Sequence, residues 1–394
     1  LVNINTSFGF KKVVDKVKLV NGSQFKELYN EQLANQKDDP FDYTGWDANT
    51  DWQDEIFQTA FITNNNISIT GASPKHSFYL GVGYSYEQGN IEHEKFSKAS
   101  NDYKITDFLK VGFQFNGARM LPADSKQVLN ALRATPIAPV YNNEYGLYTA
   151  LPEFQKAQIN NPMVDVELKA NTTKAENYRA SGNIYGEVDF LKHFTFKAMF
   201  SMDYASNNGR TYTPIVKVYD AAVNGGISTL GTGKTEVSQF KENETKVQSD
   251  YLLTYTNSFD NGNHNLTATA GFTTYYNSLS RLDGARKQGV GLVIPDNPDK
   301  WFVSIGDAAT ATNGSTQWER STLSVLARVI YNYKGKYLFS ASGRYEADSR
   351  LSKDNRWNLF PAVSVGWRIS DEAFMAGTKN WLDNLKLRVG YGVA

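Results

Sequence analysis

The stretch that decides the fold reads STLSVLARVIYNY at residues 321–333 and, after a short turn at 334–336, YLFSASGRYE at residues 337–346. In the first segment apolar side chains such as Leu323 and Val325 occupy alternate positions, and most residues between them are polar. A period of two is typical of a β-strand with one apolar and one polar face. The second segment repeats the pattern, so the two are predicted to pair as an antiparallel hairpin.

The same alternation recurs along the whole chain. With the two strands above, we count about twelve predicted strands, the others lying at 2–10, 66–71, 78–86, 109–116, 178–190, 194–204, 251–259, 266–276, 361–369 and 385–391. At about ten residues, about 3.3 Å per residue and a tilt near 40°, such strands cross the ~25 Å apolar band of a bacterial outer membrane. Strands of soluble proteins average nearer ~5 to 6 residues.

The predicted connections differ in length. Some are tight turns, such as the Asn- and Gly-containing 260–263, whereas 119–174 and 207–241 are long polar stretches, the first with a helical patch at 126–133. Helical spacing also appears at 23–36, and a short amphipathic turn at 51–57. Short turns at one rim and long loops at the other are typical of transmembrane β-barrels, with the turns periplasmic and the loops extracellular.

Composition narrows the classes of protein. The chain of 394 residues has 41 Lys and Arg and 41 Asp and Glu, and this zero net charge argues against nucleic acid as a partner. Hydrophobic residues make up 41%, and no stretch approaches the ~20 apolar residues of a spanning helix. There is no cysteine, which excludes disulfides and Cys-ligated metals.

The sequence carries no catalytic or metal-binding motif. Its four histidines stand singly, without a second ligand at metal-like spacing: His76, His93, His193 and His264. The acidic pairs at 54–55 and 371–372 are interpreted as solvated turns, and the Pro- and Asp-rich stretch at 295–299 as an extracellular loop. We therefore predict no catalytic residue, no metal and no cofactor, and the chain is not expected to be an enzyme.

Aromatic residues, 13% of the chain, divide between the two strand faces. Phe113, Phe196 and Phe272 are in phase with the apolar face and are predicted to face lipid. The candidates for substrate contact fall on the opposite phase, toward the lumen: Tyr79, Tyr185 and Tyr275. Such tyrosines could stack on sugars or contact peptides, or simply fill space against a plug domain.

Several segments also resemble a known family. TDWQDEIF at 50–57 and NISITG at 66–71 are similar to the early-barrel signature of SusC/RagA-like TonB-dependent transporters of the Bacteroidetes. The stretch YLFSASGRYEADSRLSKDNRWNLFPAVSVGWRISDEAF at 337–374 is a more specific match, continued by LDNLKLR at 382–388 and Tyr391-Gly392. The resemblance covers essentially the whole chain.

The resemblance implies a fold and a set of partners. It implies an all-β, antiparallel transmembrane barrel of 22 strands with a plugged lumen, of which residues 1–394 are expected to be a partial barrel domain of about twelve strands. The plug, the TonB box and the C-terminal strands are expected to lie outside this chain. Implied partners are a SusD-like surface lipoprotein, TonB through a segment not in this chain, outer-membrane lipid, glycan or peptide cargo, and a second transporter–lipoprotein pair in a dimer.

Three functions compete on the sequence alone. The leading one is active import of nutrient oligomers, glycan or oligopeptide, through the bacterial outer membrane. The alternative is a non-transporting surface glycan-binding or adhesin β protein, which would need shorter strands or a polar outer face. A barrel enzyme would need a convergent Ser/His/acid set, which His264 and Ser280 do not provide. The sequence does not identify the cargo, the TonB coupling, the loop residues that contact the lipoprotein, or a metal bound in the loops.

Overall fold

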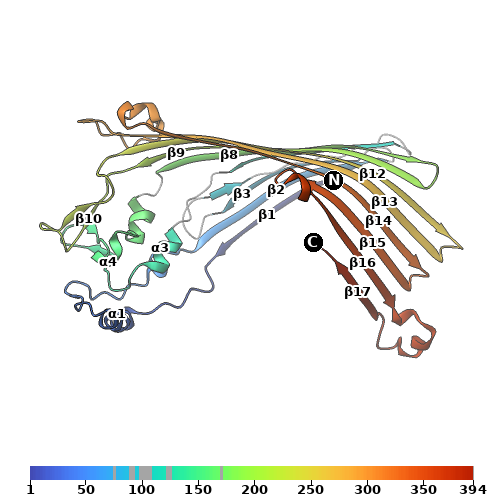
Figure 1. The fold of residues 1–394 in the computed structure, drawn as a ribbon, viewed down its shortest axis with the longest axis horizontal. Coiled ribbons are helices and arrows are strands. Elements are labelled where there is room, and N and C mark those ends of the chain that lie inside the picture. The colour runs from blue at the N-terminus through green and yellow to red at the C-terminus, as the bar shows by residue number, and fades with distance from the viewer. Residues whose placement is uncertain (74–76, 88–93, 97–108, 121–126, 169–171, 394) are drawn as a thin grey trace.

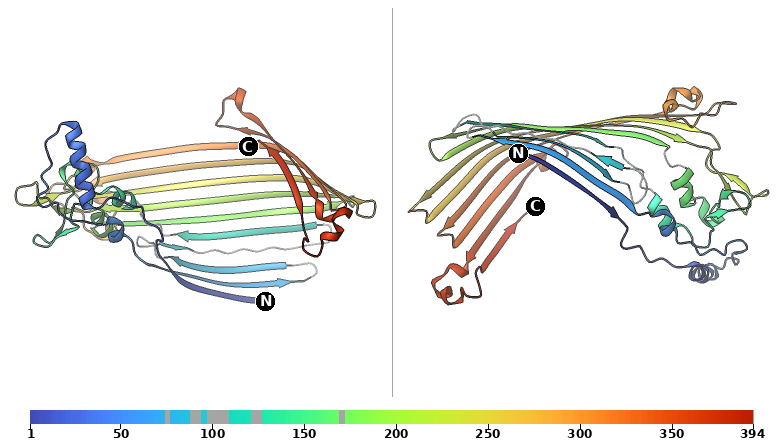
Figure 2. Two further views of the ribbon diagram at one scale, coloured as in Figure 1. Left: turned by 90° about the horizontal axis from the view of Figure 1, so that it is seen from below. Right: turned by 180° about the vertical axis from the view of Figure 1, so that it is seen from behind.

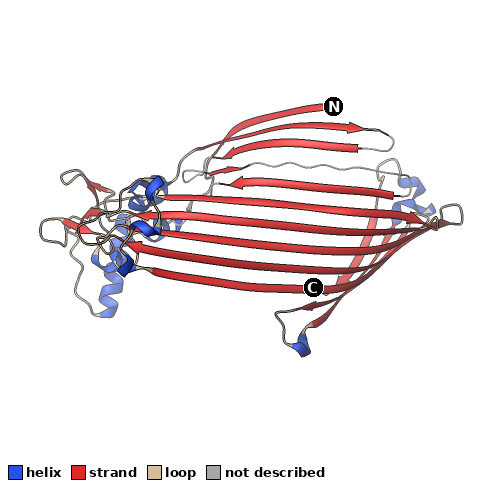
Figure 3. Cartoon of the chain, turned by 90° about the horizontal axis from the view of Figure 1, so that it is seen from above, coloured by secondary structure: helices blue, strands red, loops and turns tan. Residues whose placement is uncertain are grey.

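The chain folds into a curved wall of long antiparallel strands (Figure 1). The computed structural model describes residues 1–73, 77–87, 94–96, 109–120, 127–168 and 172–393. A smaller sheet has the strand order β1-β2-β3-β4, and a nine-stranded sheet the order β17-β16-β15-β14-β13-β12-β9-β8-β5. The smaller sheet lies alongside the larger one (Figure 3).

The strands of the smaller sheet are β1 (Val2–Lys11), β2 (Ala60–Ala72), β3 (Ser77–Glu87) and β4 (Glu94–Phe96). Those of the larger sheet are β5 (Leu109–Met120), β8 (Thr173–Phe190), β9 (Phe194–Thr213), β12 (Glu236–Phe259), β13 (His264–Lys287), β14 (Thr312–Tyr333), β15 (Tyr337–Asp348), β16 (Trp357–Arg368) and β17 (Lys386–Gly392). Neighbours pair antiparallel throughout. Each of the twelve predicted segments lies within one of these strands, apart from one residue at an end of the segments in β16 and β17, whereas β4 was not predicted.

The predicted hairpin is β14–β15, in which Val325 lies opposite Tyr345. The turn between these strands places Lys334 and Gly335 at positive φ, 53° and 69°. This left-handed pair is the geometry of the tight turns that join strands in β-hairpins. The hairpin is therefore confirmed, with the register that puts both apolar faces on one side.

The predicted strand length was wrong for the centre of the larger sheet. Strands β8, β9 and β14 contain 18, 20 and 22 residues, and β12 and β13 contain 24 each. The predicted long loop at 207–241 is accordingly shorter, because β9 continues to Thr213 and β12 already begins at Glu236. At about 3.3 Å per residue and a tilt near 40°, 24 residues rise about 60 Å, far beyond the ~25 Å apolar band.

Only part of each long strand is apolar on its outer side. In β9 the residues from Phe194 to Tyr204 that share one face include Phe196, Phe200 and Met202, whereas the same face continues beyond Tyr204 as Ser206, Asn208 and Arg210. The apolar segment thus spans ten positions, which matches the thickness of the membrane. The remainder of the strand is a polar extension.

The cross-strand register makes this apolar face continuous. Phe272 on β13 lies opposite Tyr251 on β12 and Val325 on β14. The phenylalanines predicted to face lipid share this face, and Phe113, Phe196 and Phe272 are all more than a third exposed. We call this side the outer face, because the wall is convex there and the helices lie on its concave side (Figures 1 and 2).

Aromatic side chains border the apolar band. Along the short-turn rim the outer face carries the turn-side belt, made of Phe190, Phe194, Tyr255, Phe259, Tyr333, Tyr337 and Trp367. Ring contacts link its members, as in Phe194 to Tyr255 at 5.0 Å between centroids. The loop-side belt lies eight to twelve positions further along the strands and comprises Tyr178, Tyr204, Tyr276, Tyr345 and Trp357. Two such belts flanking an apolar band are a hallmark of transmembrane barrels.

Helices and small hairpins gather at the other rim, where the long connections lie (Figures 1 and 2). They are α1 (Gly22–Gln36), α2 (Trp52–Ile56), α3 (Gln127–Arg133), α4 (Glu153–Lys156), the strand pairs β6 (Tyr141–Asn142) with β7 (Leu147–Tyr148) and β10 (Lys217–Tyr219) with β11 (Ile227–Thr229), a π-helix at Val164–Leu168 and 3-10 turns at Pro298–Lys300, Val303–Ile305, Ala308–Thr310 and Lys353–Asn355. Two further 3-10 turns, Ile369–Asp371 and Ala373–Thr378, lie at the short-turn rim. Helices α1 and α3 confirm the helical spacing predicted at 23–36 and the helical patch at 126–133, and α2 lies within the short amphipathic turn predicted at 51–57.

The helix α1 shows how local sequence sets an element. The Asn21 side chain accepts a hydrogen bond from the Gln24 backbone N–H at 2.9 Å, and the Gln24 side chain accepts one from the Asn21 N–H at 3.0 Å. This reciprocal capping box satisfies two amide groups that the first helical turn leaves unpaired. Lys37 ends the helix in the left-handed conformation.

Among the residues that the structure describes, the wall does not close into a barrel. Strand β1 lies at one edge of the smaller sheet and β17 at one edge of the larger sheet, and no described strand pairs with both. A 22-stranded closed barrel therefore stays a prediction. None of the described helices is long and apolar enough to cross a membrane.

Candidate functional site: the polar wall and the loop cap

The inner, concave face of the wall is polar and lined with paired charges. Lys110 Nζ lies 2.7 Å from Glu187 Oε1 across β5 and β8, and Arg179 lies 2.7 Å from Asp203 across β8 and β9. Further along the wall Arg344 contacts Glu346 at 2.5 Å. Because cations and carboxylates lie side by side, both across neighbouring strands and along one strand, this face presents both signs of charge and suits contact with water.

All three tyrosines predicted to line the lumen lie on this polar face. Tyr79 on β3 is opposite Thr70, in phase with Asn66 and Ser68. Tyr185 on β8 is opposite Met199 of β9, and Tyr275 on β13 is opposite Gln248 of β12. Three strand spacings separate Tyr185 from Tyr275 across the sheet, about 14 Å at the usual spacing. Along the strand direction the two tyrosines are offset by two residues. Their contact with a cargo stays a prediction.

Tyr185 is held flat against the wall. A Cβ built on Gly112, its neighbour on β5, would come within 2.2 Å of the Tyr185 ring, so the ring occupies the space that the glycine leaves. The Lys197 ammonium lies 4.3 Å from the ring centroid, a cation–π contact. Part of the Tyr185 ring is therefore already in contact with residues of the sheet.

The long connections at the loop rim pack into one unit, which we call the loop cap: residues 12–59, 127–168 and 214–235. Its core contains Trp46, Trp52, Ile56, Ala131, Ala134, Ile137, Ala138 and Leu151, each buried. Trp52 is 2% exposed, and its indole N–H donates to the Thr135 carbonyl at 2.9 Å. Backbone bonds from Thr50 to Pro136 and from Ala48 to Ile137 join the first connection to the second.

The third connection is attached to the second. Val216 and Val218 share a buried cluster with Ala150 and Val164, and the Ala150 N–H donates to the Tyr219 carbonyl at 2.6 Å. Lys156 adds an ion pair at 2.9 Å to Asp220, whose side chain is only 4% exposed. Hydrogen bonding to Glu153 and Asp220 raises the pKa of Lys156, so its ammonium stays charged at neutral pH. Three loops that are far apart in the sequence therefore form a single packed body over the loop rim.

The groups weighed for chemistry serve structural roles. The Glu372 carboxylate accepts hydrogen bonds from the Tyr337 hydroxyl at 2.7 Å, the Trp367 indole at 3.1 Å and Lys336 at 3.2 Å, which fixes members of the turn-side belt. Asp54 pairs with Lys16. His264 contacts the Tyr331 hydroxyl at 2.6 Å. In the described part of the chain no group of three or more His, Asp or Glu residues could hold a metal ion; His76 and His93 lie outside the described residues.

Sequence reasoning missed the loop cap and the packing of residues 288–311. Directly after the stretch at 295–299, which is interpreted above as an extracellular loop, Trp301 is 1% exposed and stacks on Tyr212 at 5.5 Å between centroids. Tryptophans within polar loops, such as Trp46, Trp52 and Trp301, were the available signal, because a large apolar ring in a long connection is rarely left in water.

Comparison with known proteins adds relatives along the whole length. No family model matches the chain. The TonB-dependent receptor P3 of Formosa agariphila is 29% identical over 413 residues, which cover 99% of this chain and 38% of the relative. The TonB-dependent receptor SusC of Bacteroides thetaiotaomicron is 25% identical over 430 residues, covering 100% of this chain and 39% of the relative. The chain thus spans about two fifths of the length of these curated relatives.

Solved structures share the fold. The structure of the RagAB peptide transporter superposes with a TM-score of 0.69 and 17% identity, covering 99% of this chain and 47% of that chain. The RagAB peptide importer in its closed-closed state gives the same TM-score at 18% identity. At this identity the likeness shows the fold alone: the RagAB structures share the large antiparallel sheet.

Proposed function

We propose that the chain forms part of the barrel of an importer of nutrient oligomers. The premise is that the chain is a homologue of the SusC-type TonB-dependent receptors of the bacterial outer membrane. The homology confirms the predicted family resemblance and the predicted localisation. Residues 1–394 would be a partial receptor barrel domain, and the relatives are named as TonB-dependent receptors.

The observation that carries the proposal is the outer face. Its apolar band, ten residues tall and bordered by two aromatic belts, has the dimensions of the outer-membrane hydrocarbon. The inner face of the same strands is polar and charged. The competing surface adhesin needed a polar outer face or shorter strands, and this sheet has neither.

The cargo would pass along the polar wall beneath the loop cap. Aromatic rings stack on sugars and also contact peptide side chains, so Tyr79, Tyr185 and Tyr275 suit either a glycan or an oligopeptide. A partner lipoprotein of the SusD type would dock on the loop cap, TonB would drive the transport, and two transporter–lipoprotein pairs would form a dimer. The RagAB structures are, by name, of a peptide transporter.

Purification of the full-length receptor from outer membranes in mild detergent tests this function. We expect a co-purifying lipoprotein and a bound glycan or peptide, identified by mass spectrometry, and loss of growth on that nutrient when the receptor is deleted. Recovery of the receptor alone in the soluble fraction would contradict the proposal.

The inner-face tyrosines provide a sharper test, because Tyr275 and Tyr276 are adjacent and point to opposite faces. We expect Tyr275→Ala to weaken cargo affinity about three- to tenfold, the value of one lost aromatic contact of about 0.5–1.5 kcal/mol. Tyr276→Ala, in the loop-side belt, is the matched control and should leave affinity unchanged. Equal effects of the two substitutions in a calorimetric titration would remove Tyr275 from the cargo path.

A further inference from the structure

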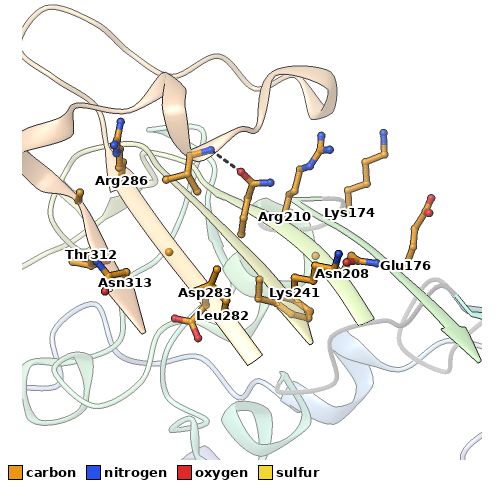
Figure 4. A pocket seen from close by; sticks show the side chains of 16 residues that line it. Lys174, Glu176, Asn208, Arg210, Lys241, Leu282, Asp283, Arg286, Thr312 and Asn313 are labelled. Carbon is orange, nitrogen blue, oxygen red and sulfur yellow. Dashed lines mark hydrogen bonds between the residues drawn. The ribbon is translucent and has the colours of Figure 1, made fainter. Parts of the chain in front are cut away.

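A pocket of about 800 Å³ lies on the outer side of the strand extensions, above the loop-side belt (Figure 4). Its floor is formed by β8, β9, β12 and β13, and residues 303 and 311–313 form one edge. The Val303 N–H donates to the Gln239 side chain at 2.9 Å, which anchors this edge to the sheet. The pocket is on the opposite side of the wall from the cargo path.

Four cations line the pocket, one from each strand of its floor: Lys174, Arg210, Lys241 and Arg286. Lys174 and Arg210 lie directly opposite each other across β8 and β9. Figure 4 shows Lys174, Arg210 and Arg286 pointing away from the sheet on one side, whereas Asp283 points to the other side. The strand register gives the same division, because Arg286 and Asp283 are an odd number of positions apart on β13.

Two of these cations, Arg210 and Lys174, are only weakly compensated by acids among the described residues. Arg210 is paired with a ring and not with an acid, its guanidinium carbon lying 4.0 Å from the Phe302 centroid. Lys174 contacts Asp299 at 3.5 Å, but the Asp299 side chain is 86% exposed, so water screens the pair. Glu176, the acid on the same face, is already bound by Arg119 and by the Tyr178 hydroxyl, each at 2.6 Å. The pocket therefore keeps an excess of positive charge.

The height of the pocket above the loop-side belt determines which layer of the membrane the pocket faces. Lys174 lies four residues beyond Tyr178 on β8, Arg210 six beyond Tyr204 on β9, and Arg286 ten beyond Tyr276 on β13. At about 3.3 Å per residue and a tilt near 40°, these offsets rise about 10 to 25 Å above the loop-side belt. The polar interfacial layer of a bilayer is only about 5 to 8 Å thick on each side, so the pocket faces the space just outside it, where the sugar and phosphate groups of a glycolipid extend. Basic pockets on membrane proteins bind anionic lipid headgroups.

We propose that this pocket binds the phosphate groups of a phosphorylated glycolipid of the outer leaflet, a site that rests on the outer-membrane placement but is independent of the cargo. Arginine offers two parallel donors to a phosphate, and lysine adds a mobile point charge. Arg210, backed by the Phe302 ring, would hold the phosphate while Lys174 and Lys241 flank it from the neighbouring strands. Leu282, 63% exposed in the same pocket, offers an apolar contact for the glycolipid.

The test compares two triple variants of the full-length receptor that lose the same charge. K174Q/R210Q/K241Q alters the pocket, and K192Q/K353Q/K379Q removes three exposed lysines from connections outside the loop cap. Each protein is purified in detergent and titrated with purified lipopolysaccharide, with the same lipopolysaccharide after phosphatase treatment, and with inorganic phosphate, and the complexes are counted by native mass spectrometry.

We expect the pocket variant to bind lipopolysaccharide at least about tenfold more weakly, with the loop variant unchanged. Phosphatase treatment should weaken binding to the unmodified receptor to the same degree, and inorganic phosphate should not compete at equal concentration if the site takes a lipid headgroup. Equal losses in both variants, indifference to phosphatase, or loss of a co-purifying protein instead of glycolipid would each overturn the proposal. Heat-modifiable mobility of both variants in gels shows that their barrels are folded, and unchanged cargo binding separates this site from the import function.

Discussion

Replacement of Trp52 by alanine is expected to open the loop cap while leaving the strands of the wall intact. The indole is 2% exposed, lies in the cluster shared by the first two long connections and donates a hydrogen bond to the Thr135 carbonyl. Truncating a buried tryptophan costs about 3 to 5 kcal/mol, which is enough to populate a cap with its loops separated.

The readout is amide hydrogen exchange of the full-length receptor in detergent. The Thr50 N–H, which donates to the Pro136 carbonyl, should lose protection by about 100-fold or more, since each 1.4 kcal/mol is a factor of ten. Trp381→Ala is the matched control, because that indole is 75% exposed and lies at the short-turn rim. Unchanged protection in Trp52→Ala, or loss of protection in β12 and β13 as well, would show that the cap is not a separate packed unit.

The strand segments and their faces could be predicted because a membrane imposes a period of two. In the apolar band one side of each strand is apolar and the other mostly polar, as with Val325 and Ser324. Tight turns of the Lys334-Gly335 kind then fix the register of the hairpin. The predictions for Phe113, Phe196 and Phe272 were right for this reason.

The extensions of β9, β12 and β13 could not be predicted in the same way. Above the loop-side belt neither face of the sheet meets the hydrocarbon of the membrane, so Asn207, Asn208 and Lys241 carry no apolar alternation although their backbones pair fully. Strand pairing persists there through backbone hydrogen bonds, which do not depend on the hydropathy of the side chains and therefore leave no hydropathy pattern. A polar strand and a polar loop look alike in the sequence.

The candidate site likewise has one part that could be predicted from the sequence and another part that could not. The inner-face position of Tyr185 and Tyr275 could be predicted from the sequence, because it depends only on whether each residue is in or out of phase with the apolar face of its strand. The loop cap depends on contacts such as Trp52 to Thr135, 83 positions apart in the sequence, and no periodicity reports contacts of that range. The basic pocket was missed because its four cations come from four strands and assemble only through the register.

A charge placed in the centre of the apolar band is the second large expected effect. Val329 on β14 lies opposite Ala341 of β15, which is midway between the belt residues Tyr337 and Tyr345. The Val329 side chain is 37% exposed on the outer face. Arginine near the bilayer midplane of a barrel costs about 2 to 4 kcal/mol, so we expect Val329→Arg to lower the unfolding free energy of the full-length receptor in lipid by that amount and to reduce the folded fraction recovered from outer membranes.

The adjacent residue supplies the control. Ile330 is 38% exposed, nearly the same as Val329, but it faces inward between Ser340 of β15 and Thr267 of β13. Ile330→Arg places the same charge at the same depth on the polar face, where water and polar neighbours solvate it, so its cost should stay near or below about 1 kcal/mol, as for barrel positions near the membrane interfaces. Urea titrations of both variants in lipid vesicles decide the question: a larger loss for Ile330→Arg than for Val329→Arg would mean that the two faces have been assigned the wrong way round, and with them the side of the wall along which the cargo passes.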